Sequence, residues 1–200
     1  MREELREYKR ARIIEEASKL FYENGYEATS VDLLAQHLGV TKPFIYGLFP
    51  NKLSILEAVY EQSSERLVGQ ITNELQRSGP PAERLRKFIF MFVMENITHQ
   101  ISSAIFLQEE RHLSPQQLER IHEIERSFNI LLSELIEAGI ADGSFKVEDS
   151  KLASLAISGM VRWVHRWFRL EGRLSAEEIA ERMAQLGLNL VGFAGKAGVS

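Results

Sequence analysis

Two stretches of the chain combine side chains that bind anions with side chains that bind apolar or aromatic groups. The first, Thr41 to Lys52, holds hydroxyl and ammonium donors suited to phosphate oxygens, together with aromatic rings that could pack on base edges. The second, Met160 to Arg169, places both tryptophans of the protein among three arginines. An aromatic wall beside guanidinium groups suits a ligand with an apolar body and an anionic head. These residues favour binding rather than catalysis.

Arrangements typical of catalysis or metal binding are not evident. The chain has no cysteine, which excludes a disulfide framework, a thiolate metal site and a cysteine nucleophile. No Ser-His-Asp order, phosphate-binding loop or carboxylate pair stands out. His112 beside Glu109 and Glu110 could chelate an ion weakly, but the pattern favours a surface position. We therefore predict no enzyme activity, no metal site and no cofactor.

Length and charge limit the remaining classes. The 200 residues can bury a core in one large or two small domains. The formal charge of −4 excludes a basic coat over the whole surface but allows a local basic face. The N-terminus is charged where a signal peptide needs an apolar run, and the apolar run Phe88–Met94 is too short to span a membrane. We expect a cytoplasmic protein without a membrane segment.

Apolar residues recur every three or four positions, which predicts helices throughout and an all-α fold. Strand and hairpin signals are almost absent, and Asp142-Gly143 lies between two helical patterns. Ser30, Thr41 and Asn51 are expected to cap helix N-termini. The expected helices span residues 3–24, 31–38, 42–49, 52–77, 82–99, 102–111, 114–138, 149–169 and 175–193.

The segment from Thr29 to Phe49 has the pattern of a helix-turn-helix, in which two short helices are joined at Gly39. Ile45 and Phe49 lie four residues apart and are expected to face the core. This leaves the other face of the second helix free for a major groove. That face consists of Thr41, Lys42, Pro43, Phe44, Tyr46 and Gly47.

Over about residues 10–60 the chain carries a dense set of residues whose spacing matches one known family without a gap. They are Ile14, Ala17, Leu20, Phe21, Gly25, Tyr26, Thr29, Ser30, Val31, Ala35, Gly39, Val40, Lys42, Tyr46, Phe49, Lys52 and Leu56. By these residues the chain resembles the TetR family of transcriptional regulators. The resemblance implies a nine-helix architecture, with a three-helix DNA-binding domain over residues 1–52 and a ligand-binding and dimerisation domain over residues 53–200. It also implies a homodimeric repressor that binds a palindromic operator in double-stranded DNA and is released by a small-molecule effector.

The resemblance also implies which residues contact DNA. Thr29, Tyr46 and Lys52 would contact the phosphate backbone, and Lys52 also lies near a helix N-terminus, where an anion is favoured. Tyr46 could instead belong to the core. The residues expected nearest the base edges are Thr41, Lys42, Pro43 and Phe44, of which Lys42 could also contact phosphate.

The first helix carries further candidate phosphate contacts. Its basic residues alternate with acidic ones, so an ordinary solvated face is the alternative interpretation. The basic residues are Arg6, Lys9, Arg10 and Arg12, and the acidic ones are Glu3, Glu4 and Glu7.

The motif Trp-x-x-x-Trp-Phe at residues 163–168 is followed by Leu-Ser-x-Glu-Glu-Ile-Ala at residues 174–180. This segment resembles TetR regulators of lipid, steroid and acyl-CoA catabolism. That resemblance implies an acyl-CoA thioester as effector, with guanidinium groups pairing with its phosphates. The predicted ligand contacts are Trp163, Trp167, Arg162 and Arg166, with Arg169 as a further candidate; Phe90, Met94 and Phe106 are predicted from two earlier helices. For the two tryptophans the alternative is core packing or a dimer interface, and for the other three apolar residues it is core packing.

The last two predicted helices carry apolar stripes that are expected to form the homodimer interface, although internal packing is the alternative. Gly159 and Gly187 would allow close approach there. The stripe residues are Leu152, Leu155, Ala156, Gly159 and Met160, and Ile179, Met183, Leu186, Leu190 and Val191.

Two alternative functions are a multidrug-type sensor of lipophilic compounds and a small-molecule binding protein without a regulatory role.

Overall fold

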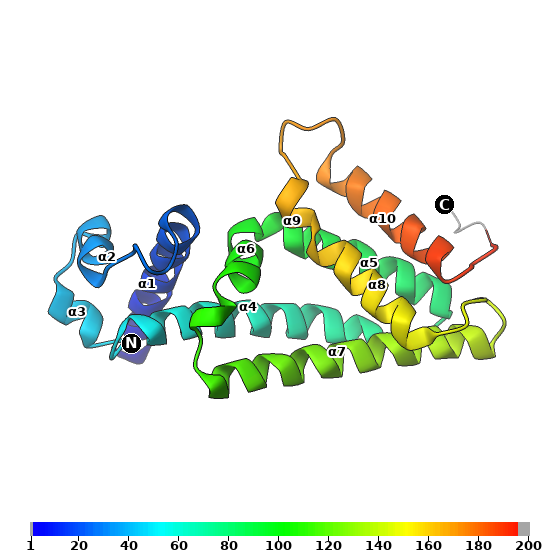
Figure 1. Ribbon diagram of the computed structural model, residues 1–200, viewed down its shortest axis with the longest axis horizontal. Helices are drawn as coiled ribbons and strands as arrows, with labels where there is room; N and C mark the ends of the chain where they lie inside the picture. Colours follow the sequence, from blue (N-terminus) through cyan, green and yellow to red (C-terminus); the bar gives the residue numbers. More distant parts are fainter. Residues whose placement is uncertain (1, 196–200) are drawn as a thin grey trace. The chain divides into compact units, whose positions relative to one another are not determined.

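A computed structural model describes the backbone of residues 2–195 and the side chains of residues 3–64 and 72–195. Every regular element in this part of the chain is a helix, which confirms the predicted all-α class (Figure 1). The helices are α1 (Arg2–Asn24), α2 (Val31–Leu38), α3 (Lys42–Tyr46), α4 (Lys52–Leu75), α5 (Pro81–Thr98), α6 (Gln100–Gln108), the 3₁₀ helix η1 (Glu110–His112), α7 (Pro115–Ala141), α8 (Ser150–Arg162), α9 (Val164–Trp167) and α10 (Ala176–Leu190).

Ten α-helices are present between residues 2 and 195, where the sequence predicts nine, because the helix expected over 149–169 is broken at Trp163. The Nδ1 of His165 lies 2.8 Å from the carbonyl oxygen of Arg162. A continuous helix would use that oxygen as the acceptor for the amide of Arg166. The Arg166 N–H instead donates to the Trp163 carbonyl at 3.1 Å, as in a tighter 3₁₀ turn.

Other helix ends also differ from the predictions. The helix expected over 42–49 stops at Tyr46, where Gly47 follows, and glycine is a poor helix former. The segment expected as one helix over 102–111 forms α6 and then η1. Two of the three predicted side-chain caps are confirmed: Ser30 accepts from the Leu33 amide at 3.0 Å, and Asn51 accepts from the Ser54 amide at 2.8 Å. Thr41 occupies the N-cap position of α3, but its side chain makes no capping hydrogen bond.

The chain forms two compact units, which are described separately. The first comprises the residues up to Ser64 together with Ile101–Ile121, and the second comprises Glu65–Gln100 together with the residues from His122 onwards. The segment containing α6, η1 and the start of α7 therefore belongs with the N-terminal helices. The predicted domain boundary after residue 52 stays a prediction.

The core of the first unit fixes α4 against α1 and α6. Phe21, Phe49 and Tyr60 are almost completely buried. The Tyr60 hydroxyl donates to the carbonyl oxygen of Ile105 at 2.8 Å, and burial raises the pKa of this phenol far above its ordinary value. A single buried network thus joins the N-terminal helices to α6.

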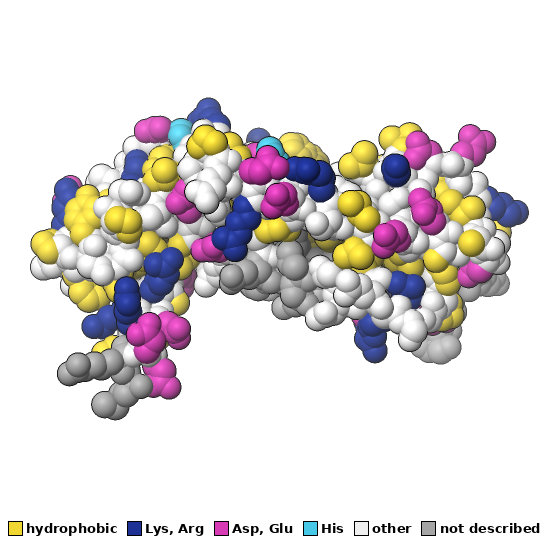
Figure 2. All heavy atoms as spheres, turned by 90° about the horizontal axis from the view of Figure 1, so that it is seen from below, with side chains coloured by type: hydrophobic (Ala, Val, Ile, Leu, Met, Phe, Trp, Pro, Cys, Tyr) yellow, Lys and Arg dark blue, Asp and Glu magenta, His cyan; other side chains and the backbone are white. Residues whose placement is uncertain are grey.

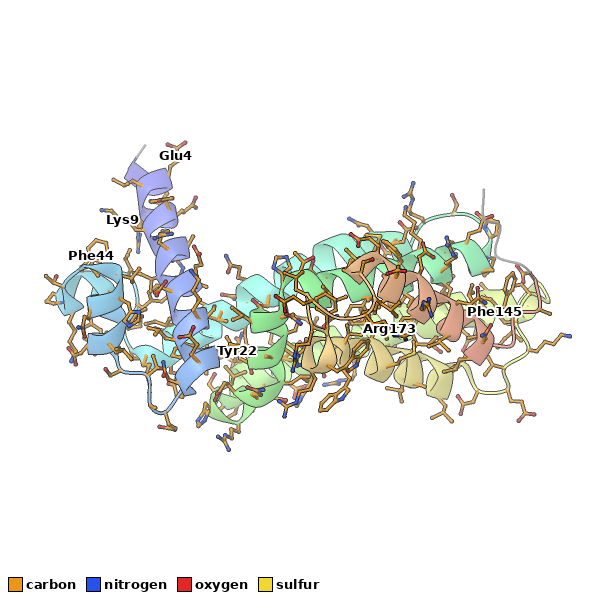
Figure 3. The ribbon with its side chains drawn as sticks, turned by 90° about the horizontal axis from the view of Figure 1, so that it is seen from above. Glu4, Lys9, Tyr22, Phe44, Phe145 and Arg173 are labelled. Atoms are coloured by element: carbon orange, nitrogen blue, oxygen red, sulfur yellow. The ribbon has the colours of Figure 1, made fainter. Side chains whose placement is uncertain are left out.

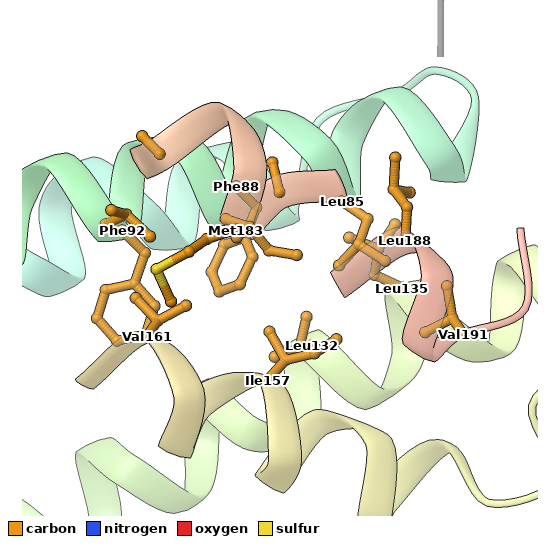
Figure 4. Packing of buried hydrophobic residues seen from close by; sticks show 14 of the residues in the cluster. Leu85, Phe88, Phe92, Leu132, Leu135, Ile157, Val161, Met183, Leu188 and Val191 are labelled. Carbon is orange, nitrogen blue, oxygen red and sulfur yellow. The ribbon is translucent and has the colours of Figure 1, made fainter. Parts of the chain in front are cut away.

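The second unit has its own core between α5, α7, α8 and α10 (Figure 4). The rings of Phe88, Phe92 and Phe128 pack with centroids 5.2–5.8 Å apart. Gly187 of α10 is buried against Ile89 of α5, where an added Cβ would lie 2.2 Å from the Ile89 Cδ1. The expectation that Gly187 allows close approach between subunits is therefore wrong, because this glycine serves packing within the protomer.

Candidate nucleic-acid interface and ligand groove

The turn between α2 and α3 has the geometry of a helix-turn-helix. Gly39 adopts a left-handed backbone with φ of 65°, which glycine tolerates without steric cost. The amide of Gly39 donates to Gln36 at 3.2 Å, and that of Val40 donates to Ala35 at 3.0 Å. These bonds end α2 and direct the chain into α3. Ile45 is completely buried beyond the turn, as predicted.

The opposite face of α3 is open to solvent. Thr41, Pro43 and Tyr46 are exposed, and Phe44 is half-buried. Tyr46 has 43% of its surface exposed, which excludes the alternative interpretation as a core residue. A short helix is thus presented with hydroxyl, aromatic and apolar groups facing outwards, as a groove-binding helix requires.

Lys42, at the start of α3, is already engaged within the protein. Its Nζ lies 2.7 Å from Oδ2 of Asp32 in α2. The hydrogen bond to Asp32 raises the pKa of the Lys42 ammonium, so this group stays charged near neutral pH. Sequence analysis missed Asp32, although its place in the first turn of α2 could have marked it as an acidic neighbour of the recognition helix.

Lys52 is held over the turn that precedes α2. Its Nζ donates to the carbonyl oxygens of Tyr26 at 2.8 Å and of Glu27 at 3.4 Å, and it lies 4.1 Å from the centroid of the Tyr26 ring. A lysine ammonium has three N–H donors, so these two hydrogen bonds leave one donor for a phosphate oxygen. Lys52 and the open face of α3 belong to the same unit.

Thr29 does not occupy the position that the resemblance implies. It is 1% exposed, and its hydroxyl lies 3.1 Å and 2.9 Å from the carbonyl oxygens of Leu20 and Gly25. Thr29 is therefore not placed to contact a phosphate, contrary to the expectation. Its hydroxyl holds the loop before α2 against the end of α1, and the neighbouring exposed residue with a hydroxyl group is Ser30.

Two basic residues of α1 lie against aromatic rings near α3. Lys9 places its Nζ 5.3 Å from the Phe44 ring centroid, and Figure 3 shows Lys9 on the side of α1 nearest Phe44. Arg10 stacks on the Phe49 ring at 4.3 Å. Basic and acidic side chains also lie next to one another near the start of α1 (Figure 2), so its charge is mixed, as the sequence suggests.

A surface groove of about 770 Å³ lies in the second unit between α8, α9, α10 and the loop that joins α9 to α10. Trp163 and Trp167 are 56% and 47% exposed, which excludes the alternative of an internal core for both. The groove is lined by Gly159, Met160, Trp163, Trp167, Phe168, Arg169, Gly172, Arg173, Leu174, Ile179, Arg182, Met183 and Leu186.

The arginines at this groove differ from those predicted. Arg162 pairs with Glu125 of α7, and Arg166 lies over the Trp163 ring at 5.9 Å, but neither lines the groove. The lining arginines are Arg169, which was a further candidate, and Arg173 and Arg182, which were not predicted. Sequence analysis missed Arg182, although it lies one helical turn before Leu186. Arg173 lies in a loop, where no helical spacing could have predicted that it lines the groove.

The other predicted ligand residues lie elsewhere. Phe90 and Met94 pack at the edge of the second core and do not line the groove. Phe106 belongs to the first unit, where its ring packs on Tyr60 at 5.1 Å. His112 was expected on the surface, but its side chain is only 15% exposed, because it packs on the Tyr26 ring.

One apolar face of α8 and α10 is exposed. Leu152, Leu155 and Leu186 have more than half of their surface exposed, and Leu190 has 39%. Ile179, Met183 and Val191 were predicted to share this face, but all three are buried in the protomer core. Their alternative interpretation as internal packing is therefore the correct one, while the leucines remain available to a partner.

Among the described residues, no helix has the length and hydropathy needed to cross a bilayer. The same residues contain no group of three histidine, aspartate or glutamate side chains placed to hold a metal ion.

Comparison with known proteins gives matches along most of the chain. The family model described as bacterial regulatory proteins, tetR family, matches residues 13–59. The model described as a tetracyclin repressor-like C-terminal domain matches residues 78–191. Together they account for the helix-turn-helix and for most of the second unit.

Individual relatives are similar over nearly their whole length. The HTH-type transcriptional repressor KstR2 of Mycolicibacterium smegmatis is 27% identical, over 87% of this chain and 86% of its own length. The TetR family transcriptional regulator PfmR from Thermus thermophilus is 34% identical, with a TM-score of 0.82 over 89% and 97% of the two chains. AibR, solved with isovaleryl coenzyme A and operator DNA, is 26% identical, with a TM-score of 0.81 over 88% and 96%.

Proposed function

The chain belongs to the tetR family of bacterial regulatory proteins, and on this basis we propose that it is a homodimeric transcriptional repressor released from operator DNA by an acyl-CoA thioester. The observation that carries the DNA-binding part is the open face of α3 beside Lys42 and Lys52. Because its target is operator DNA, we place its action in the cytoplasm.

The DNA contacts divide by chemistry. Tyr46 and Lys52 bind phosphate oxygens through a hydroxyl and an ammonium group. Thr41 and Lys42 reach base edges or the adjacent phosphates from the first turn of α3, while Pro43 and Phe44 offer apolar contacts to a thymine methyl. Thr29 has no direct part, because its hydroxyl is buried.

The homodimer forms through α8 and α10. Leu152 and Leu155 continue along α8 to Gly159, and Leu186 and Leu190 lie one turn apart on α10. Exposed leucines in this number are costly in water, and a symmetric partner buries the same patch on both subunits. Residues up to 52 form the DNA-binding domain and those from 53 onwards form the ligand-binding and dimerisation domain.

The effector binds in the tryptophan groove. The groove is mainly apolar, with Trp163 and Trp167 on one side, which suits an acyl chain or the adenine ring of a CoA. Arg169, Arg173 and Arg182 supply guanidinium groups for its phosphates. AibR, which has a similar fold, was solved with a CoA thioester and DNA. Arg162 and Arg166 border this segment and stay secondary candidates, and Phe90, Met94 and Phe106 stay outside the proposed site.

The effector releases the repressor by shifting the population between two conformations. An effector that binds the DNA-incompetent conformation more tightly raises the population of that conformation and so lowers the affinity for operator DNA. By linkage, operator DNA lowers the affinity for the effector by the same factor.

The effector proposal is tested by titrating the purified protein with palmitoyl-CoA and isovaleryl-CoA while following tryptophan fluorescence. Saturable quenching by a thioester, but not by the free acid, supports it, and the double variant Arg173→Met/Arg182→Met should lose that response. Arg120→Met, whose arginine pairs with Glu61 in the first unit, is the matched control. Quenching by a lipophilic cation alone would favour a multidrug-type sensor instead.

A further inference from the structure

A small polar cluster in the first unit lies beside Lys52. It consists of Tyr26 and Glu27, in the loop between α1 and α2, and of Glu109 and His112, at the two ends of the η1 segment. Glu109 is 7% exposed, which is unusual for a carboxylate without a function or a close set of partners. The cluster was not predicted, because its two halves are far apart in the sequence.

The buried carboxylate of Glu109 fixes the loop before α2. Its Oε1 accepts the backbone N–H of Tyr26 at 3.3 Å. The Tyr26 carbonyl in turn accepts a hydrogen bond from Lys52 at 2.8 Å, so one residue of the loop connects Glu109 to Lys52. A displacement of this loop would therefore displace the Lys52 ammonium as well.

His112 contacts the side chain of Tyr26, whereas Glu109 binds the backbone of the same residue. The two rings lie with centroids 4.9 Å apart, and Lys52 Nζ lies 4.1 Å from the same tyrosine ring. The His112 Nδ1 is 3.2 Å from Glu27 Oε1, and its Nε2 is 3.4 Å from Glu109 Oε2. His112 thus bridges the loop and η1 by its nitrogens while its ring supports Tyr26.

We propose that Glu109 and His112 are positioning residues for DNA binding, which hold the Tyr26 loop so that Lys52 is preorganised toward a phosphate. This inference rests on the proposed phosphate contact of Lys52. A lysine with a fixed ammonium loses less conformational freedom on binding than a free one, so its contact contributes more to affinity. Glu109 and His112 need not touch DNA themselves.

The test uses a fluorescein-labelled duplex that the wild-type protein selects from a randomised pool. Its dissociation constant is measured by fluorescence anisotropy over a range of KCl concentrations. Lys52→Met should weaken binding and lower the salt slope by about 1.8 per dimer, because one phosphate contact is lost from each subunit. Glu109→Ala should weaken binding by about fivefold per subunit, the effect of one hydrogen bond lost in each.

Two results separate positioning from general support of the fold. In a Lys52→Met background, Glu109→Ala should have little further effect, because both changes remove the same contact. Glu109→Gln should restore most of the affinity, since its amide oxygen can still accept the Tyr26 N–H. His112→Phe, which keeps a ring against Tyr26 but removes both nitrogens, should weaken binding in the same Lys52-dependent way and provides a second test if Glu109→Ala does not fold.

Glu61→Gln, which removes a carboxylate of the same unit paired with Arg120, is the matched control and should leave affinity unchanged. Additive losses for Glu109→Ala and Lys52→Met would overturn the positioning role while leaving the Lys52 contact intact. An unchanged affinity and salt slope in Lys52→Met would overturn the proposed contact and, with it, the inference.

Discussion

The ammonium of Lys42 lies 2.7 Å from the carboxylate of Asp32, so the first residue of α3 is tied to α2 by an exposed ion pair. This pair places a negative charge beside the face proposed to meet DNA phosphates. It also occupies one donor of a lysine proposed to contact DNA. DNA binding must therefore either accommodate the Asp32 carboxylate or break the pair.

Asp32→Asn is expected to tighten binding to the selected duplex by up to about fivefold per subunit, because it removes a weak, exposed ion pair that competes with phosphate for the Lys42 ammonium. The gain should shrink as KCl is raised, since salt screens exposed charges. Lys42→Met should weaken binding. Anisotropy titrations at several KCl concentrations measure both effects, and weaker binding by Asp32→Asn would show that the pair instead supports the bound conformation.

Tyr46→Ala is expected to weaken binding to the same duplex without changing the oligomeric state. Tyr46 is 43% exposed and is not among the buried core residues, so the fold should be retained. Tyr22→Ala removes a similarly exposed tyrosine from α1 and is the matched control. Equal affinities for Tyr46→Ala and wild type would remove Tyr46 from the proposed interface.

Leu152→Glu is expected to convert the dimer to monomers, because a carboxylate would be desolvated in the proposed α8–α10 interface. Leu152 is 64% exposed in the protomer and does not line the tryptophan groove, so both the fold and the groove should tolerate the change. Ile140→Glu, at an exposed position of α7, is the control. Sedimentation velocity gives the mass directly, and a persistent Leu152→Glu dimer would place the interface elsewhere.

Acid should weaken the second unit through Glu74. Burial raises the pKa of this carboxyl, but hydrogen bonds from Lys87 and Arg77, at 3.0 Å and 3.3 Å, outweigh it and hold the pKa below its ordinary value. A carboxyl with a lowered folded-state pKa stabilises the protein fully above its unfolded pKa of about 4.3. That contribution is lost as pH falls through the folded pKa.

Glu74→Gln is therefore expected to have a lower free energy of unfolding than wild type at pH 7, and the difference should narrow below about pH 4.3. Urea denaturation at a series of pH values measures it. Glu23→Gln, which removes an exposed carboxylate of α1, is the control variant. A constant difference from pH 7 to pH 3 would contradict the assignment of the shift to Glu74.

Features set by local sequence could be predicted, and those set by distant packing could not. The caps at Ser30 and Asn51 depend on residues three positions away, and each forms as expected. The break at Trp163 depends on the His165 side chain competing for a backbone carbonyl. Periodicity marks Gly187 as facing a neighbour but does not say that the neighbour is Ile89 of the same chain.

The candidate DNA-binding face and the ligand groove show the same difference between features set by local sequence and features set by distant packing. The open face of α3 was predictable because the helix-turn-helix pattern fixes which side of a short helix is buried. The burial of Thr29, by contrast, depends on carbonyl oxygens at the end of α1. The identity of the groove arginines depends on how α10 packs beside α8, which no local pattern contains.

Binding of operator DNA by the helix-turn-helix and its release by an acyl-CoA thioester can be tested in one experiment. The anisotropy of the selected duplex is measured with wild-type protein, titrated with palmitoyl-CoA or isovaleryl-CoA and, in parallel, with the free acids. We expect tight, salt-dependent binding that a thioester reverses and the acids do not. Failure to select any duplex, or binding that neither thioester weakens, would contradict this expectation.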